Sequence, residues 1–206
     1  MRAQLIDDIL HLADNSLILG QRNGEWCGHG PILEQDIAIT NITLDLVGQA
    51  RSFYQYTAQL KADGSSEDSL AYLRTEREFK NCLLVEQPNG DWAQTLLRQF
   101  LFSSYQYYLY QYLQNHTDTT IAAIAEKSLK EVSYHLRWSS EWVIRLGDGT
   151  EESHQRMVNA VDALWRYTGE MFTPAPYEKE LGIDVASLIY EWSKKVKEIL
   201  DDATLA

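Results

Sequence analysis

The sequence contains few cysteines, few prolines and no long run of apolar residues. Its two cysteines, Cys27 and Cys82, are too few for a disulfide framework, so we expect free thiols and a reducing, cytoplasmic location. No stretch of about 18 apolar residues occurs, and acidic residues interrupt residues 1–15, where a secretory signal needs an apolar core. We therefore expect a protein that is neither exported nor inserted into a membrane.

Basic residues are also scarce. Lys and Arg total 18 against 30 Asp and Glu, which gives a formal net charge of −12. This charge disfavours nucleic acid and anionic membrane surfaces as main partners and suits a basic protein partner. The chain also lacks a Gly-x-Ser-x-Gly motif and a phosphate-binding glycine loop, so nucleophilic catalysis has little support.

Hydrophobic residues are abundant in the chain and follow a helical pattern. Of its 206 residues, 45% are hydrophobic and 11% aromatic, enough for one domain with a sizeable core. Apolar residues recur at steps of three and four, whereas no alternating run predicts a strand. We expect Gly20 to end the first helix, Pro31 to lie in the first turn of the second and Asp91 to cap the third long helix. The predicted helices cover residues 3–19, 32–60, 69–84, 92–116, 117–146, 151–172 and 185–200. The predicted fold is all-α, a four-helix bundle with additional shorter helices.

Such bundles can hold two iron ions, so we searched the sequence for the ligands that a di-iron site requires. Two helices would each supply one carboxylate, and the other two would each supply Glu-x-x-His. In the segment KEVSYHLRW, Glu131 and His135 are four residues apart, and the residue three before His135 is Val132. The second helix offers Leu46-x-x-Gln49 at the matching place. Of these four ligand positions, only His135 keeps a ligating side chain.

The remaining helices do not compensate. Between Asp91 and Asp118 there is no Asp or Glu, and the first helix keeps only Asp14 and Asn15. Iron needs carboxylate donors, so we predict that this chain binds no metal and that its centre is dry and packed. His135 is then structural and forms an i, i+4 hydrogen bond with Glu131.

An alternative is a divergent metal-dependent oxidoreductase that works alone through Glu131 and His135, with acids such as Asp14 or Asp45. Replacing Val132 by Glu131 as the ligand rotates the side chain by about 100° around the helix, which weakens this alternative. A storage ferritin would need the missing carboxylates as well.

A glycine-rich loop carries the second candidate site, formed by Glu25, Trp26, Cys27 and His29. Cys27 and His29 could share an ion, but no second Cys/His pair follows at zinc-finger spacing. We favour a tight turn or an interface motif in which Trp26 packs against a neighbouring surface. The sequence leaves open whether that surface belongs to this chain or to a partner.

Tyrosines crowd the third long helix. Because one helical face cannot hold Tyr105, Tyr107, Tyr108, Tyr110 and Tyr112, some of them must point outward. They fit either a partner interface or an ordinary half-buried surface.

Several long phrases resemble a known family. They are EWCGHGPILEQDIAITNITLDLVGQAR, LLVEQPNGDWAQTLLRQF, KEVSYHLRW, RLGDGT and LWRYTGEMF. Together they resemble the C subunits of bacterial phenylacetyl-CoA epoxidase, also called ring-1,2-phenylacetyl-CoA epoxygenase, collinearly from residue 5 to about 172. The resemblance implies a ferritin-like fold, pairing with a homologous catalytic A subunit that carries the di-iron centre, and no iron in this chain.

The resemblance also sets the predicted function. We expect residues 1–206 to form a single ferritin-like domain with a C-terminal segment shorter than is usual in the family. The chain would be a non-catalytic structural subunit of a multicomponent di-iron monooxygenase that epoxidises the ring of phenylacetyl-CoA in aerobic phenylacetate degradation. Its partners would be the A subunit and other epoxidase components including a reductase, in assemblies that contain a homodimer or a heterotetramer. The stoichiometry, the surface that binds the A subunit and any contact with CoA stay open.

Overall fold

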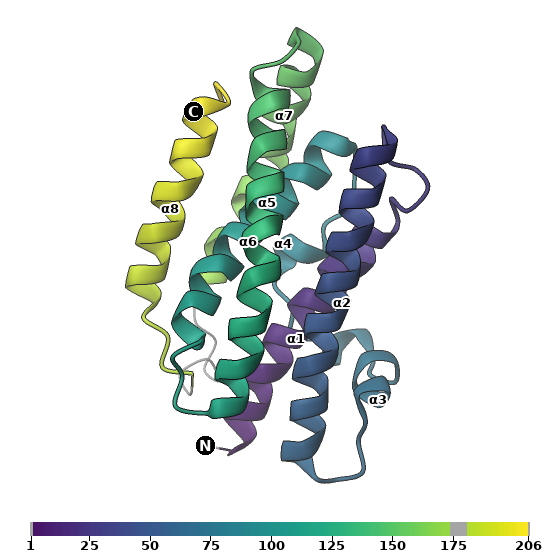
Figure 1. Cartoon of the computed structure of the whole chain (residues 1–206), viewed down its shortest axis with the longest axis vertical. Helices are drawn as coiled ribbons and strands as arrows, with labels where there is room; N and C mark the ends of the chain where they lie inside the picture. Colours follow the sequence, from purple (N-terminus) through teal and green to yellow (C-terminus); the bar gives the residue numbers. More distant parts are fainter. Residues whose placement is uncertain (1, 174–180, 206) are drawn as a thin grey trace.

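The structure is a computed structural model, and it describes residues 2–173 and 181–205. Four long helices dominate it: α1 (Arg2–Gly24), α2 (Leu33–Lys61), α5 (Trp92–Leu113) and α6 (Thr119–Gly147). They form two packed pairs, α1 with α2 and α5 with α6, and α2 against α6 joins the pairs. Figure 1 shows the resulting bundle, in which no strand occurs among the described residues. The predicted all-α, ferritin-like architecture is confirmed.

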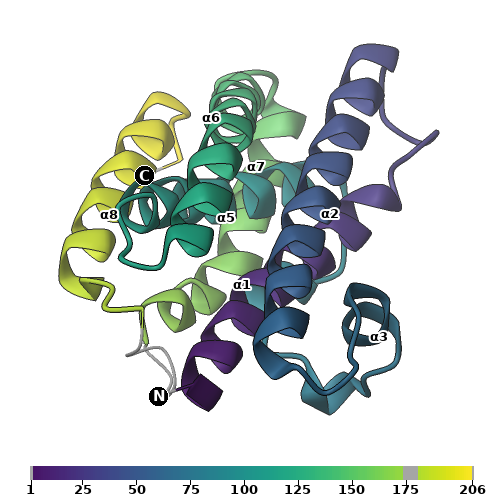
Figure 2. The same cartoon turned by 60° about the horizontal axis from the view of Figure 1, so that its bottom comes forward.

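Shorter elements surround the bundle. α7 (Glu151–Leu164) and α8 (Val185–Asp202) pack on α5 and α6, and α4 (Leu83–Glu86) contacts α1 and α5. α3 (Glu67–Tyr72) lies beside α2, as Figure 2 shows from a second side. Single 3-10 turns complete the chain at Glu76–Glu78, Trp165–Tyr167 and Gly169–Phe172.

The prediction that Gly20 ends the first helix is wrong, because α1 runs on to Gly24. Gly20 is instead a packing residue: a Cβ at this position would lie 3.3 Å from the Cβ of Leu46 on α2. The missing side chain lets the two helices approach closely. Pro31 precedes α2, whose N-cap is Ile32, so the prediction that it lies in the first turn of the helix is also wrong.

The segment predicted as one helix over residues 69–84 is divided. α3 starts at a capping box formed by Ser66 and Ser69 and ends at Tyr72. Beyond it, the guanidinium of Arg74 donates to the carbonyl of Leu70 at 2.5 Å and turns toward α1. The guanidinium also pairs with Asp14 on α1, and this long-range contact lies just beyond the end of a helix that the local pattern extends. Similarly, the helix predicted over residues 151–172 ends at Leu164 and continues as two 3-10 turns.

Two other predicted boundaries agree closely with the structure. Asp91 caps α5 by accepting from the backbone N–H of Gln94 at 3.0 Å. α6 begins two residues later than predicted, after Asp118, which accepts from the N–H groups of Thr120 and Ile121. Both caps satisfy N–H groups that the first turn of a helix leaves free.

A glycine where α6 ends provides the first testable prediction. A Cβ on Gly147 would overlap the carbonyl oxygen of Ala203 and lie 2.8 Å from the Cβ of that residue. Gly147→Ala should therefore push the C-terminal end of α8 away from α6, and we expect a loss of about 1–3 kcal/mol in the free energy of unfolding. Urea denaturation followed by circular dichroism measures this loss.

Gly48, inside α2, is the matched control. A Cβ there meets no atom within 4 Å, so Gly48→Ala should be neutral or stabilise by about 0.5–1 kcal/mol through helix propensity. Equal losses for the two variants would contradict the packing explanation.

Candidate functional site

The positions expected to carry metal ligands lie at the contact between α2 and α6. Two polar rungs cross this contact. The ring Nε2 of His135 lies 3.0 Å from Oδ2 of Asp45, and the side-chain amide of Gln49 donates to Oε2 of Glu131 at 3.0 Å. Each helix supplies its two residues at an i, i+4 spacing, so the rungs lie one turn apart. Glu131 and His135 therefore each bond to α2, and the prediction that they bond to each other is wrong.

The second rung continues into the bundle through neutral groups. The hydroxyl of Tyr110 lies 3.5 Å from Oε1 of Gln49, and the amide of Gln106 donates to both Tyr110 and Ser16 at 3.3 Å. Burial raises the pKa of Tyr110, which keeps its hydroxyl protonated. Together with Glu131 on α6, this chain of side chains joins all four long helices.

Aliphatic side chains occupy the other two ligand positions. Leu46 and Val132 are fully buried. Neither can donate an electron pair, Gln49 is already engaged by two partners, and His135 is directed to Asp45. Among residues 2–173 and 181–205, no group of three or more His, Cys, Asp and Glu side chains lies close enough to hold an ion. The donors at these positions do not fit a di-iron centre, which needs several carboxylates.

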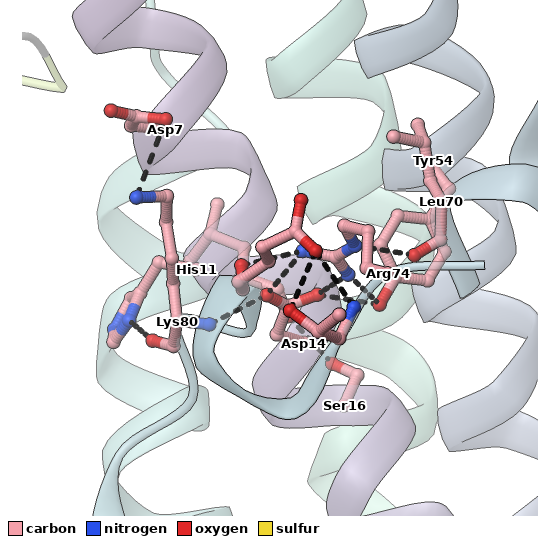
Figure 3. Close-up of polar contacts among 11 residues, drawn as sticks. Asp7, His11, Asp14, Ser16, Tyr54, Leu70, Arg74 and Lys80 are labelled. Carbon is pink, nitrogen blue, oxygen red and sulfur yellow. Dashed lines mark hydrogen bonds and ion pairs between the residues drawn. The ribbon is translucent and has the colours of Figure 1, made fainter. Parts of the chain in front are cut away.

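Asp14, considered as a remnant ligand, belongs to a different cluster. It is fully buried and accepts from the hydroxyl of Tyr54 at 2.5 Å, from the guanidinium of Arg74 and from the backbone N–H of Lys80 at 2.8 Å. Figure 3 shows Asp14 at the centre of these contacts. The loop after α3 thus closes on α1 through one carboxylate.

The carboxylate of Asp14 stabilises both the charged form of Arg74 and the protonated hydroxyl of Tyr54. Burial and the neighbouring Asp14 raise the pKa of Tyr54. Burial opposes the charge of Arg74, but its contacts with Asp14 and Tyr54 outweigh that effect and raise its pKa. The guanidinium also lies over the ring of Phe79, 4.1 Å from its centroid. A buried carboxylate paired in this way is structural and has no electron pair to spare for a metal.

Asn15 also holds this loop. Its side-chain carbonyl accepts from the backbone N–H of Cys82 at 2.8 Å, and its amide lies 3.0 Å from the ring of His11. The other nitrogen of His11 contacts the carbonyl of Lys80 at 2.6 Å. Asp14 and Asn15 together fix the approach to α4.

The glycine-rich loop between α1 and α2 is anchored within the same chain. The indole N–H of Trp26 donates to Thr95 on α5 at 2.9 Å, and its ring packs edge-on against Trp92, 4.9 Å between centroids. Glu25 accepts from Arg22 at 3.1 Å and from Asn89 at 2.8 Å. The surface that receives Trp26, left open by the sequence, therefore belongs to this chain.

The turn itself depends on Asp36, which accepts from the backbone N–H groups of Gly28 and Gly30 at 3.2 and 2.9 Å. These bonds, the one from Gly30 first, lower the pKa of Asp36. His29 bonds to the carbonyl of Cys27 at 3.1 Å, and Cys27 is an exposed free thiol. The ring of His29 thus bonds within a local turn, with φ +80° at Gly28, which agrees with the tight turn that the sequence analysis favoured over a zinc site.

The five tyrosines of α5 divide as the helical pattern predicts. Tyr105 and Tyr110 are buried, Tyr107 and Tyr108 are half-buried, and Tyr112 is exposed.

Arg98 is a residue that the sequence reasoning missed. It is fully buried and donates to the carbonyl of Gln87 and to Oδ1 of Asn89, the latter at 2.5 Å. Burial lowers its pKa to about 9. The available signal was a lone arginine in a helix that contains no acidic residue. This helix directly follows the turn sequence QPNGD, and the arginine holds that turn in place.

No helix in the described part of the chain is long and apolar enough to span a bilayer.

Comparison with known proteins adds two findings. A family model described as “Phenylacetic acid catabolic protein” matches residues 1–206. The chain is also 46% identical over 207 residues to the C subunit of 1,2-phenylacetyl-CoA epoxidase from Escherichia coli (strain K12), across 98% of this chain and 83% of that protein. The resemblance that the sequence phrases predicted is confirmed.

The Asp14 cluster provides the second testable prediction. Asp14→Asn leaves the largely buried guanidinium of Arg74 without its counter-charge, and we expect a loss of about 3 kcal/mol in the free energy of unfolding, measured by urea denaturation. The matched control is Glu152→Gln, which makes the same chemical change in the exposed pair with Arg156, 2.7 Å apart. It should cost less than about 0.5 kcal/mol. Equal losses would refute a structural role for the buried pair.

The two cysteine thiols provide the third testable prediction. Cys27 is exposed, whereas burial raises the pKa of Cys82 to about 12. Because alkylation requires the thiolate, iodoacetamide at pH 8 should label Cys27 and spare Cys82 in the folded protein. Mass spectrometry of peptides locates the label, and both residues should react in guanidinium chloride. Fast labelling of Cys82 in the native state would show that the segment before α4 opens readily.

Proposed function

Because the chain belongs to the phenylacetic acid catabolic protein family, we propose that it is the C-type subunit of an epoxidase that acts on phenylacetyl-CoA. The observation that carries this proposal is the 46% identity to such a subunit across 98% of the chain. The aligned region covers 98% of the chain and therefore includes all four long helices and the loops between them. A relationship confined to the common bundle pattern would not be expected to do so.

Within that assembly we propose a structural, non-catalytic role. Leu46 and Val132 fill space at two ligand positions, and Gln49 and His135 use their polar groups to join α2 with α6. Such a bundle can hold its helices together without a metal through side-chain hydrogen bonds, such as those of Gln49 with Glu131 and Tyr110. It can support a homologous subunit that carries the di-iron centre and oxidises the aromatic ring of phenylacetyl-CoA. The remaining partners would include a reductase.

The alternative, an oxidoreductase that works alone through Glu131 and His135, has less support. Both residues are held by side chains of α2, and each of these contacts has the length of an ordinary structural hydrogen bond. Asp14, its other suggested ligand, is paired with Arg74.

We also propose a cytoplasmic location. Cys27 and Cys82 are both free thiols, one exposed and one buried, which suits a reducing compartment.

The fourth prediction tests the role. We expect epoxide formation from phenylacetyl-CoA only when this chain is combined with the iron-bearing subunit and the reductase. Liquid chromatography with mass spectrometry detects the product, and plasma mass spectrometry measures the metal. The chain alone should contain substoichiometric iron and show no turnover. Full activity of the other components without this chain would contradict the proposal.

Two uncharged polar variants separate a structural role from a catalytic one. Glu131→Gln and His135→Asn should lower the thermal unfolding midpoint but leave the kcat of the assembled complex within about threefold of the wild type. A fall of about 100-fold in kcat with unchanged assembly would favour the alternative in which these residues act directly.

A further inference from the structure

The outward side of α2 carries an unusual amount of exposed apolar surface. Side chains on α2 and at the end of α3 are between 39% and 80% exposed, and we call them the α2–α3 apolar face: Leu33, Ile37, Leu44, Val47, Tyr72 and Leu73. On a helical wheel, the four residues of α2 fall within one quarter of the circumference. α3 packs beside the same helix, as Figure 2 shows.

Large apolar side chains that gather on one exposed face mark interaction sites. Leu33, Leu44, Tyr72 and Leu73 are each more than 60% exposed. The face therefore offers the apolar centre that a protein interface needs.

A small pocket lies within this face. Its volume is about 90 Å³. Apolar and aromatic side chains form most of its lining, and three charged residues complete it: Leu17, Val47, Ala50, Tyr54, Ala71 and Tyr72, with Arg51, Glu67 and Asp68. That volume suits one aliphatic or aromatic side chain from outside. Interfaces concentrate their binding energy in such buried anchors.

The spacing of outward residues indicates the shape of the occupant. Leu33, Ile37, Leu44 and Val47 form an apolar stripe along the outer side of α2, about 20 Å from end to end at the helical rise per residue. Such a stripe suits a second helix that lies along α2. Gly48 is open, because a Cβ at this position would have no atom within 4 Å, so a second helix can approach closely.

The charges around the face decide between two sources for that helix. Acidic side chains outnumber basic ones at the edge of the face. The acids are Glu34, Asp45, Glu67 and Asp68, and the base is Arg51. The whole chain has a net charge of −12. A second copy would place like charges together, whereas a helix flanked by Lys or Arg would be attracted.

We propose that the α2–α3 apolar face docks an amphipathic helix of another epoxidase subunit, one with basic residues beside its apolar seam and one large apolar side chain that enters the pocket. This inference rests on the proposed function, because it requires the assembly that the function implies.

The fifth prediction tests the face by charge. Leu44→Lys and Val47→Lys place an ammonium group in the centre of the interface beside a basic helix. Each should weaken binding to the co-expressed iron-bearing subunit by roughly 30-fold or more, measured by biolayer interferometry. Ile189→Lys is the matched control on α8, where the side chain is similarly exposed, and it should bind within threefold of the wild type. Circular dichroism establishes that all three variants fold.

A second measurement does not depend on added charge. In a Cys27→Ser background, Leu44→Cys should react with a maleimide in the free chain and become at least tenfold slower in the complex. Unchanged labelling would overturn the docking inference.

The outcomes separate this inference from the function. If the wild-type chain binds no other epoxidase subunit, the proposed function fails. If it binds, and only Ile189→Lys weakens binding, the function stands and this face is the wrong surface. If the wild-type chain alone forms a dimer that Leu44→Lys dissociates in analytical ultracentrifugation, the occupant is a second copy, and the commitment to a basic partner helix is wrong.

Discussion

The contact between α2 and α6 is the constraint on which the bundle depends. Four long helices meet at a level where polar side chains from every helix enter the interior, and a buried polar group without a partner is costly. Gln49 resolves this by bonding outward to Glu131 and inward to Tyr110. The pair formed by His135 and Asp45 joins the same two helices one turn away. These contacts join α2, α5 and α6 at this level of the bundle.

The same principle explains the loops. Asp14 binds the segment after α3, Asn15 holds the approach to α4, and Arg98 holds the turn before α5. Each is a buried polar side chain of a long helix that satisfies backbone groups of an irregular segment. Stability and connectivity are therefore linked, because loosening one of these side chains frees a loop as well as a hydrogen bond.

Sequence reasoning succeeded where a local pattern decides the structure. The cap at Asp91 and the period of the long helices were predicted correctly because first-turn N–H groups and apolar periodicity are local properties. It failed at Gly20, Tyr72 and Leu164. At Gly20 the deciding contact is with Leu46 on another helix, and beyond Tyr72 the deciding contact is between Arg74 and Asp14. For the end of α7 at Leu164 we have no physical account.

By itself, the sequence determined the all-α class and the family, and it predicted that Leu46, Gln49 and Val132 hold no iron, because side-chain chemistry and helical spacing can be read from the sequence. Only the tertiary structure decided what the remaining polar residues do. Glu131 and His135 are four residues apart, yet each bonds to α2, and Trp26 packs on α5 of its own chain. Partners far apart in the sequence become neighbours only when the helices pack, so no local spacing could assign them.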